Sequence, residues 1–205
     1  NIQHARSFRI PPRPRLLGPR RELLVGRIPD RRQREPARRE HLHLGHPLEE
    51  DARPLAVGIA PYLDAGLGER PLTTDAAEGR GSATMVSLLA PYAASSASTW
   101  VVSLGTNDNP EEFADQAAAV MDLAGPDRCV VWFDVWRIDT DESINATLQS
   151  LAAGYPNLRL VAWHDVASVH PEWFSGTDVH PSTAGYAVRG QMAVDAVNRE
   201  CGTSP

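Results

Sequence analysis

The chain has 205 residues, a formal net charge of −6 at pH 7 and a hydrophobic fraction of 42%, which fits one domain with an ordinary core. The net negative charge argues against nucleic acid as a partner. The sequence has no run of 18 apolar residues, so we expect no membrane span. The given sequence does not start with a basic segment followed by an apolar one and then small residues, so we expect no signal peptide in it.

Charge divides the chain into two parts. Residues 1–53 hold 13 Arg against 7 Asp and Glu, a balance of +6, whereas residues 54–205 hold 7 Arg against 19 acidic residues, a balance of −12. The first part is rich in Pro and Arg and keeps no period beyond residues 22–25, which is typical of disorder. We therefore predict a tail over 1–53 and a folded domain over 54–205.

Three interpretations of the tail stay open. It is a basic arm for an acidic partner, a plain disordered extension, or an out-of-frame translation. The abrupt change of character near Pro54 favours the last. All 20 basic residues of the chain are arginine, which indicates a gene rich in G and C rather than a chemical requirement.

From residue 55 onward, apolar spacing predicts alternating helices and strands. In chain order they are a helix over 56–67, a strand over 72–76, a helix over 82–89, a strand over 98–104, a helix over 110–123, a strand over 129–133, a helix from 141 or 143 to 151, a strand over 158–163 and a helix over 182–199. This alternation predicts an α/β fold with a parallel sheet, whose ligands bind at the carboxyl ends of the strands.

Residues 105–108 (GTND) follow a predicted strand directly. Glycine permits a tight exit from the strand, and the amide of Asn107 can donate to an oxyanion. The alternative is a turn in which Asn107 or Asp108 only caps the next helix.

Residues 177–182 (TDVHPS) place His180 in the loop before the last predicted helix. An imidazole there can act as a general base near neutral pH, and a neighbouring carboxylate such as Asp178 would fix its tautomer. The alternative is a surface histidine near a helix start.

Together these motifs resemble the third and fifth blocks of the SGNH (GDSL-type) esterase superfamily, and the resemblance spans residues 55–201. Residues 55–60 (LAVGIA) are similar to the end of the first block, 75–81 (DAAEGRG) to the second, and 170–174 (HPEWF) to actinobacterial secreted members. The resemblance implies a three-layer α/β/α sandwich with a parallel, flavodoxin-like sheet of about five strands. It also implies an oxyanion hole formed by Gly79 and Asn107, with His180 as the base.

The activity implied is hydrolysis or transfer of a small acyl group by a serine, on an acyl ester that includes esters of carbohydrate or cell-wall material. Neither an organic cofactor nor a metal is expected. The resemblance further implies a monomer at the cell envelope or outside the cell.

The sequence departs from the family pattern at two places. Where the family has Gly-Asp-Ser, residues 52–54 are Ala, Arg and Pro, and Pro54 cannot be a nucleophile. The family's triad aspartate comes three residues before the histidine, where this chain has Thr177, with Asp178 one residue later. An inactive binding scaffold or the product of a disrupted gene is therefore the alternative function.

The central strand of this fold, which precedes the nucleophile, is poorly encoded. Residues 47–51 (PLEED) make a poor buried strand. Residues 41–44 (HLHL) are the best nearby substitute, and 23–26 (LLVG) are a second candidate far upstream. Because a sheet without its central strand leaves backbone groups unpaired, we expect marginal stability or recruitment of one of these segments.

Several other residues carry weaker signals. Cys129 and Cys201 allow one disulfide, which would indicate an oxidising compartment, or two separate thiols. Ser82 is either a displaced nucleophile or, more plausibly, a helix cap. The remaining candidates are expected to be structural, and they are the pair at 164–165 (HD), the tail histidines His41, His43 and His46, and the tryptophans Trp132, Trp136 and Trp163.

Overall fold

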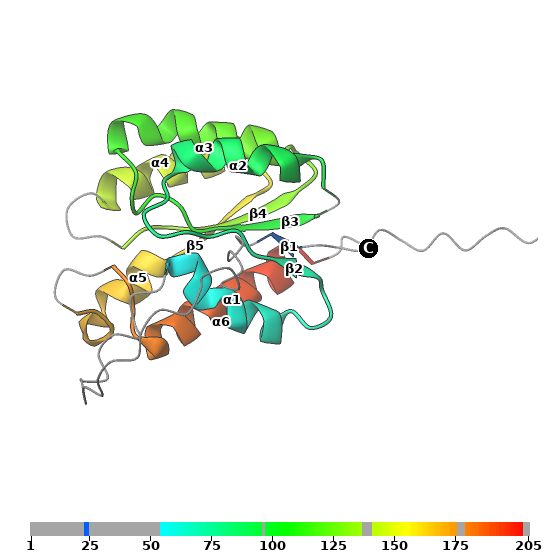
Figure 1. Ribbon diagram of the computed structural model, residues 1–205. Coiled ribbons are helices and arrows are strands. Elements are labelled where there is room, and N and C mark those ends of the chain that lie inside the picture. The colour runs from blue at the N-terminus through cyan, green and yellow to red at the C-terminus, as the bar shows by residue number, and fades with distance from the viewer. Residues whose placement is uncertain (1–22, 25–53, 96, 137–140, 176–178, 203–205) are drawn as a thin grey trace, which may run out of the picture.

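The computed structural model describes residues 23–24, 54–95, 97–136, 141–175 and 179–202. It is a three-layer sandwich in which a parallel sheet lies between two layers of helices (Figure 1). In chain order the elements are β1 (Leu23–Leu24), α1 (Leu55–Gly66), β2 (Leu72–Thr73), α2 (Ser82–Ala93), β3 (Thr99–Val102), α3 (Pro110–Ala124), β4 (Cys129–Phe133), α4 (Asp141–Gly154), β5 (Leu158–Val161), α5 (Trp163–Ser168), the 3₁₀ turn η1 (Pro171–Trp173) and α6 (Thr183–Glu200). The predicted α/β fold is confirmed.

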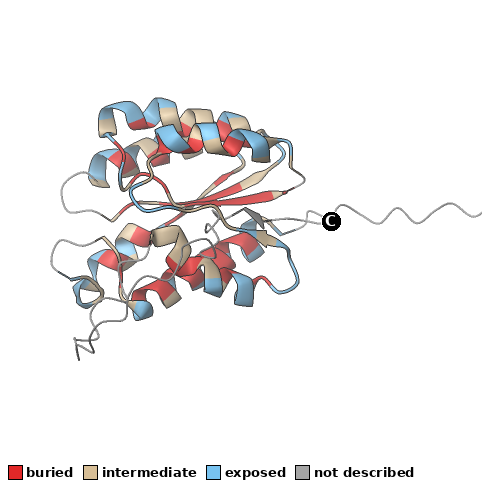
Figure 2. Ribbon diagram, viewed as in Figure 1, coloured by how far each residue is buried: buried red, intermediate tan, exposed pale blue. Residues whose placement is uncertain are grey.

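Helices α2, α3 and α4 cover one face of the sheet, and α1, α5 and α6 cover the other (Figure 1). Buried residues concentrate on the sides of the helices that face the sheet (Figure 2). Helix α3 begins as predicted, with Pro110 in its first turn and the side chain of Asn109 accepting a hydrogen bond from Glu111 N at 3.1 Å. The sequence did not indicate α5 or η1, which are too short to show a clear period.

The five strands run in the order β2-β1-β3-β4-β5, and all neighbours are parallel. The central position is filled by Leu23–Leu24, which pairs with Leu72 and Thr73 on one side and with Thr99 and Trp100 on the other. The structure therefore shows that an upstream segment is recruited as the central strand. This segment belongs to residues 23–26, the second of the two candidates. The first, residues 41–44, lies outside the described residues.

The use of Leu23–Leu24 means that the link from the central strand to α1 is longer than the short link usual in this fold. A long connection costs little more entropy than a short one, because the cost of closing a loop grows only with the logarithm of its length. The sheet thus takes one strand from the 1–53 segment, and the tail stays a prediction for the rest of that segment.

Helices α1 and α6 pack unusually closely, because glycines remove side chains from their contact. A Cβ atom added at Gly58 of α1 would lie 2.1 Å from Tyr186 Cε1 of α6, and one added at Gly190 of α6 would lie 2.5 Å from Tyr62 Cβ of α1. This packing fixes the start of α1, where Pro54 stands, against the helix that follows His180.

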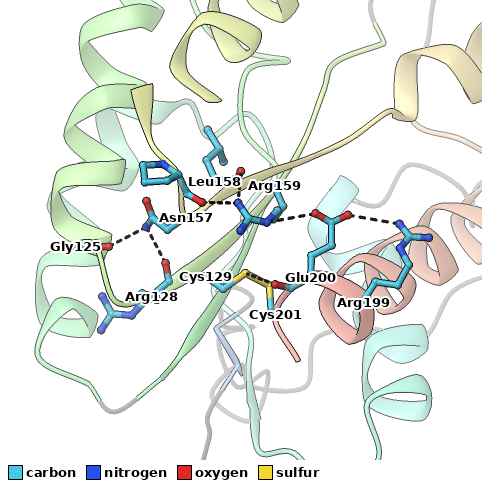
Figure 3. The surroundings of a disulfide bond; sticks show 10 residues. Gly125, Arg128, Cys129, Asn157, Leu158, Arg159, Arg199, Glu200 and Cys201 are labelled. Carbon is cyan, nitrogen blue, oxygen red and sulfur yellow. Dashed lines mark hydrogen bonds and ion pairs between the residues drawn. A yellow bond between two sulfur atoms is a disulfide. The ribbon is translucent and has the colours of Figure 1, made fainter. Parts of the chain in front are cut away.

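A disulfide joins Cys129, at the start of β4, to Cys201, just after α6 (Figure 3). It lies at the amino end of the sheet strand, close to the ion pair of Arg159 Nε with Glu200 Oε2 at 3.3 Å. Of the two alternatives for the cysteines, the structure has the bonded one. Across the described ranges, no helix is long and apolar enough to span a bilayer.

Candidate active site

A cavity brings together four positions that the sequence analysis singled out: Pro54, Gly79, Asn107 and His180. They come from the start of α1, the β2–α2 loop, the β3–α3 turn and the loop before α6. Its empty volume is about 890 Å³, including the part open to solvent. Residues up to 126 positions apart along the chain therefore share one pocket at the end of the sheet where parallel folds bind ligands.

The loop that carries Gly79 is held by an ion pair. Arg80 Nη1 lies 2.6 Å from Asp75 Oδ1, and the same nitrogen donates to the Asp75 backbone oxygen at 3.3 Å. Gly79 has φ +68°, a left-handed conformation that favours glycine. Nothing would lie within 4 Å of an added Cβ, so the backbone conformation, not crowding, selects glycine here.

Asp108 is the buried centre of the third motif. Its carboxylate accepts hydrogen bonds from Gly105 N at 2.9 Å, from Ser82 N at 2.6 Å and from Ser82 Oγ at 3.0 Å. These bonds tie the β3–α3 turn to the start of α2, next to the Gly79 loop. Asn107, one residue before Asp108, is exposed and lines the cavity.

The helix-capping alternative for this motif is wrong. The side chain of Asn109, not that of Asn107 or Asp108, caps α3. Asn107 therefore does not cap the helix and lines the cavity, while the Asp108 carboxylate stabilises the turn by accepting a hydrogen bond from Gly105 N. Gly105 is required because its φ is +118° and an added Cβ would lie 2.7 Å from Val135 Cγ2.

Pro54 is the N-cap residue of α1. Its carbonyl accepts from Gly58 N at 2.9 Å, and no side chain caps the helix. The first turn of α1 contains no acidic residue, so its partial positive charge is not offset within the helix. In this position a hydroxyl side chain would stand at the helix N-terminus, beside the cavity.

His180 is partly buried and lines the cavity. The loop that carries it is anchored by Ser182 N, which donates to Trp173 O at 2.7 Å. Asp178 and Thr177, the two candidates for the residue that orients His180, lie outside the described residues.

Arg189 of α6 lies behind the cavity and was not found from the sequence. It is 1% exposed, and its guanidinium lies 3.8 Å from the ring centroid of Phe133. Its Nη2 donates to Ser103 Oγ at 3.1 Å and its Nη1 to Leu55 O at 3.5 Å. Burial lowers the pKa of Arg189 to about 9, so the side chain is still charged at pH 7.

The position of Arg189 in the helix gives the signal that was missed. It falls on the buried stripe with Tyr186, Ala193 and Val197, at helical spacing. An arginine on such a stripe indicates a buried cation. Here the cation connects β3, through Ser103, to the start of α1.

The other candidates are placed away from the cavity or have structural roles. Ser82 is fully buried on Asp108 and is not the cap of α2, which is Gly81. His164 Nε2 lies 3.2 Å from Asp141 Oδ2. No group of three or more metal-binding side chains occurs in the part of the chain that the structure describes.

Comparison with known proteins gives a likeness in structure but not in sequence. No protein-family model matches the sequence, and no curated protein matches it significantly. The C-terminal catalytic domain of peptidoglycan O-acetyltransferase A from Streptococcus pneumoniae superposes with a TM-score of 0.62 at 17% identity, covering 87% of this chain and 92% of that domain. A member of the lipolytic G-D-S-L family from Veillonella parvula superposes with a TM-score of 0.61 at 18% identity, covering 72% of this chain and 91% of that one.

Both of these structures are SGNH-type hydrolases, and both are covered almost completely. The resemblance noted in the sequence is therefore confirmed at the level of the fold: this chain has the α/β/α fold of the SGNH (GDSL-type) hydrolases.

Proposed function

We propose that the cavity is the site of an SGNH-type O-acyl hydrolase or acyltransferase for small acyl esters, in which Pro54 occupies the place of the nucleophilic serine. The observation that supports this is the convergence of Pro54, Gly79, Asn107 and His180 on one cavity. Four motifs from separate loops rarely meet by chance at the carboxyl edge of a parallel sheet. The carbohydrate-ester class is supported by the neighbour that is named as a peptidoglycan O-acetyltransferase.

In the mechanism with a serine at position 54, its hydroxyl attacks the acyl carbon and forms an acyl-enzyme. His180 takes the hydroxyl proton and returns it to the leaving alcohol. Asp178, or Thr177 in its place, orients His180. The Gly79 N–H and the Asn107 amide stabilise the negative oxygen of the tetrahedral intermediate. This chemistry requires no metal and no organic cofactor.

Proline at position 54 has no hydroxyl group, so the first step, attack on the acyl carbon, cannot take place. Loss of a nucleophilic serine typically costs about 10⁶-fold in kcat. Two hydroxyl side chains, those of Ser103 and Thr106, also line the cavity. The Ser103 Oγ accepts a hydrogen bond from Arg189 Nη2, and this contact with a cation draws electron density from the oxygen and weakens it as a nucleophile.

The test measures hydrolysis of nitrophenyl acetate by the chain as it stands, by Pro54→Ser and by Pro54→Ser/His180→Ala. We expect background rates for the unchanged chain, a gain for Pro54→Ser, and loss of that gain in the double variant. Val169→Ala on the Pro54→Ser background is the control, because Val169 is 70% exposed and does not line the cavity, and it should leave the gain unchanged.

Two results would contradict the proposal. Activity of the unchanged chain that disappears in Ser103→Ala would move the nucleophile to Ser103. No gain in a folded Pro54→Ser variant would remove the hydrolase assignment and favour the inactive binding scaffold.

The proposal extends to the setting of the protein. A disulfide between Cys129 and Cys201 supports an oxidising compartment, at the cell envelope or outside the cell. We also propose that residues 54–205, with strand β1, act as one monomeric unit. Size-exclusion chromatography with light scattering measures the oligomeric state directly.

A further inference from the structure

The cavity of the proposed active site passes through the sheet layer beside the end of the central strand. Among the described residues, β1 pairs with β3 only as far as Trp100, although β3 runs on to Val102. The cavity is lined by every residue of 100–104 and of 75–80, the segments on either side of this position, and by residues of α1 and α2, which cover opposite faces of the sheet (Figure 1). The short central strand therefore leaves room inside the fold for a ligand.

The inner part of the cavity has an apolar wall formed by α2 and β3. Met85 and Leu89 lie one helical turn apart on α2, and Trp100, Val102 and Leu104 alternate along β3 and its exit, on one face of the sheet. All five are at most 9% exposed and belong to one core cluster. The start of α2 is bonded to the β3–α3 turn, so Leu104 lies near the mouth, and Leu89 and Trp100 lie at the inner end.

This wall is longer than an acetyl group needs. Trp100 and Leu104 are four positions apart, which corresponds to a rise of about 13 Å along an extended strand. The whole cavity has an empty volume of about 890 Å³, including the part open to solvent, and pockets of about 300–1,000 Å³ hold drug-sized ligands. A two-carbon acyl group would leave most of the inner wall uncovered.

The inner wall offers little to a polar or charged ligand. The Asp75 carboxylate, at the side of the cavity, is occupied by Arg80 Nη1 at 2.6 Å and by the Tyr92 hydroxyl at 3.4 Å. The side-chain N–H of Trp100 has no hydrogen-bond partner in the described part of the chain. A bound water needs about two to four polar partners, so this single donor does not hold one, whereas an alkyl chain is stabilised by burial against apolar side chains.

We propose that the inner part of the cavity binds the unbranched acyl chain of a medium-length acyl ester, and that Leu89 and Trp100 limit the length of this chain. The ester group then lies at the mouth, with Gly79 and Asn107. That the chain belongs to an ester cleaved or transferred in the cavity rests on the proposed function. Binding of the chain itself does not, because it requires no nucleophile.

The test is calorimetric titration of the unchanged full chain with butyrate, hexanoate and octanoate, whose carboxylates take the place of the ester group. Each methylene buried against the apolar wall should raise the affinity about fourfold, so we expect octanoate to bind at least about tenfold more tightly than butyrate. Leu89→Phe puts a larger side chain into the inner end and excludes the last methylenes, so it should weaken octanoate binding at least about tenfold. Butyrate binding should be unchanged in this variant, because the shorter chain does not reach Leu89.

Leu88→Phe is the matched control. Leu88 is the neighbouring residue of α2, packs against the same core cluster and does not line the cavity, so its enlargement should leave the octanoate affinity unchanged. If Leu89→Phe does not fold, Ala76→Leu takes its place. Ala76 is half-buried in the segment after β2 and lines the cavity, and we expect its enlargement to weaken octanoate binding.

Absence of octanoate binding overturns the proposal, as does an affinity that does not rise from butyrate to octanoate. Octanoate affinity that is unchanged in folded Leu89→Phe or, in its place, Ala76→Leu overturns it as well. The result is separable from the esterase test. Octanoate binding that depends on Leu89, combined with an inactive Pro54→Ser variant, would support the acyl-chain pocket and reject the hydrolase assignment. An active Pro54→Ser variant without octanoate binding would support the hydrolase assignment and overturn the pocket.

Discussion

The carboxylate of Asp108 binds Ser82 twice, with Oδ1 accepting from the backbone N at 2.6 Å and Oδ2 accepting from Oγ at 3.0 Å. Residues 26 positions apart are thereby locked together in the core. This contact holds the turn that carries Asn107 against the start of α2, which follows the Gly79 loop. The two proposed oxyanion-hole positions depend on it for their relative placement.

Asp108→Ala should lower the free energy of unfolding by about 3 kcal/mol or more, since hydrogen bonds to a buried charged group are strong and three donors lose their acceptor. Urea unfolding measures this. Ser82→Ala removes one of the three bonds and should cost only about 1 kcal/mol. Equal losses in the two variants would contradict the central role of Asp108.

Gly105→Ala should destabilise the protein by about 2–4 kcal/mol, because φ is +118° and the new Cβ would meet Val135. Gly68→Ala is the matched control, with φ +65° and nothing within 4 Å of the added atom. It should cost about 1 kcal/mol, from backbone conformation alone. Thermal unfolding of both variants, followed by circular dichroism, would show whether contact with Val135 adds to the cost.

Removal of the disulfide should also be costly. Cys129 and Cys201 are 72 residues apart, and a closed loop of that size restricts the unfolded chain by about 4 kcal/mol in the chain-entropy model. We expect Cys129→Ser/Cys201→Ser to lose about 2–4 kcal/mol of unfolding free energy. A reducing agent should destabilise the unchanged chain and leave the double variant unaffected.

Asp134 gives a pH-dependent prediction. Burial raises the pKa of Asp134 above its usual range, so ionisation of this carboxyl costs stability in the folded state. That cost is present above the folded-state pKa and disappears as the pH falls through it. Asp134→Asn, which keeps an oxygen for His164 N, should therefore be more stable relative to the unchanged chain at pH 7 than at pH 4.

Urea unfolding of both proteins at the two pH values tests the effect of Asp134. Val169→Ala is the control, because it removes no titratable group and should have the same relative stability at both pH values. A relative stability of Asp134→Asn that is the same at pH 4 and pH 7 would mean that burial does not shift this group.

The central strand shows where prediction from sequence reached its limit. A strand of two residues carries no period, and the short apolar run at 23–26 marked a candidate strand but did not establish that it would occupy the centre of the sheet. The pairing of Leu23–Leu24 with both β2 and β3 determines that this segment is the central strand, because it satisfies backbone groups of both neighbours. The neighbouring alternative at 41–44 had the better alternation but lies outside the described residues.

The sequence by itself determined the order of helices and strands, the class of fold and the motifs that supply Gly79, Asn107 and His180. These features are local. Each depends on the spacing of apolar residues, on turn residues or on the residues that follow a strand, within a window of about ten residues. Strand β4 was predicted with its observed bounds for this reason.

Only the tertiary structure decided which segment completes the sheet, which residue carries the buried charge behind the cavity, and which carboxylate joins the two motifs. Leu23–Leu24, Arg189 and Asp108 each act through partners far away along the chain. Pairings of this kind depend on packing and on the low polarity of the interior, where an unpaired polar group is costly. Short-range sequence patterns do not encode them.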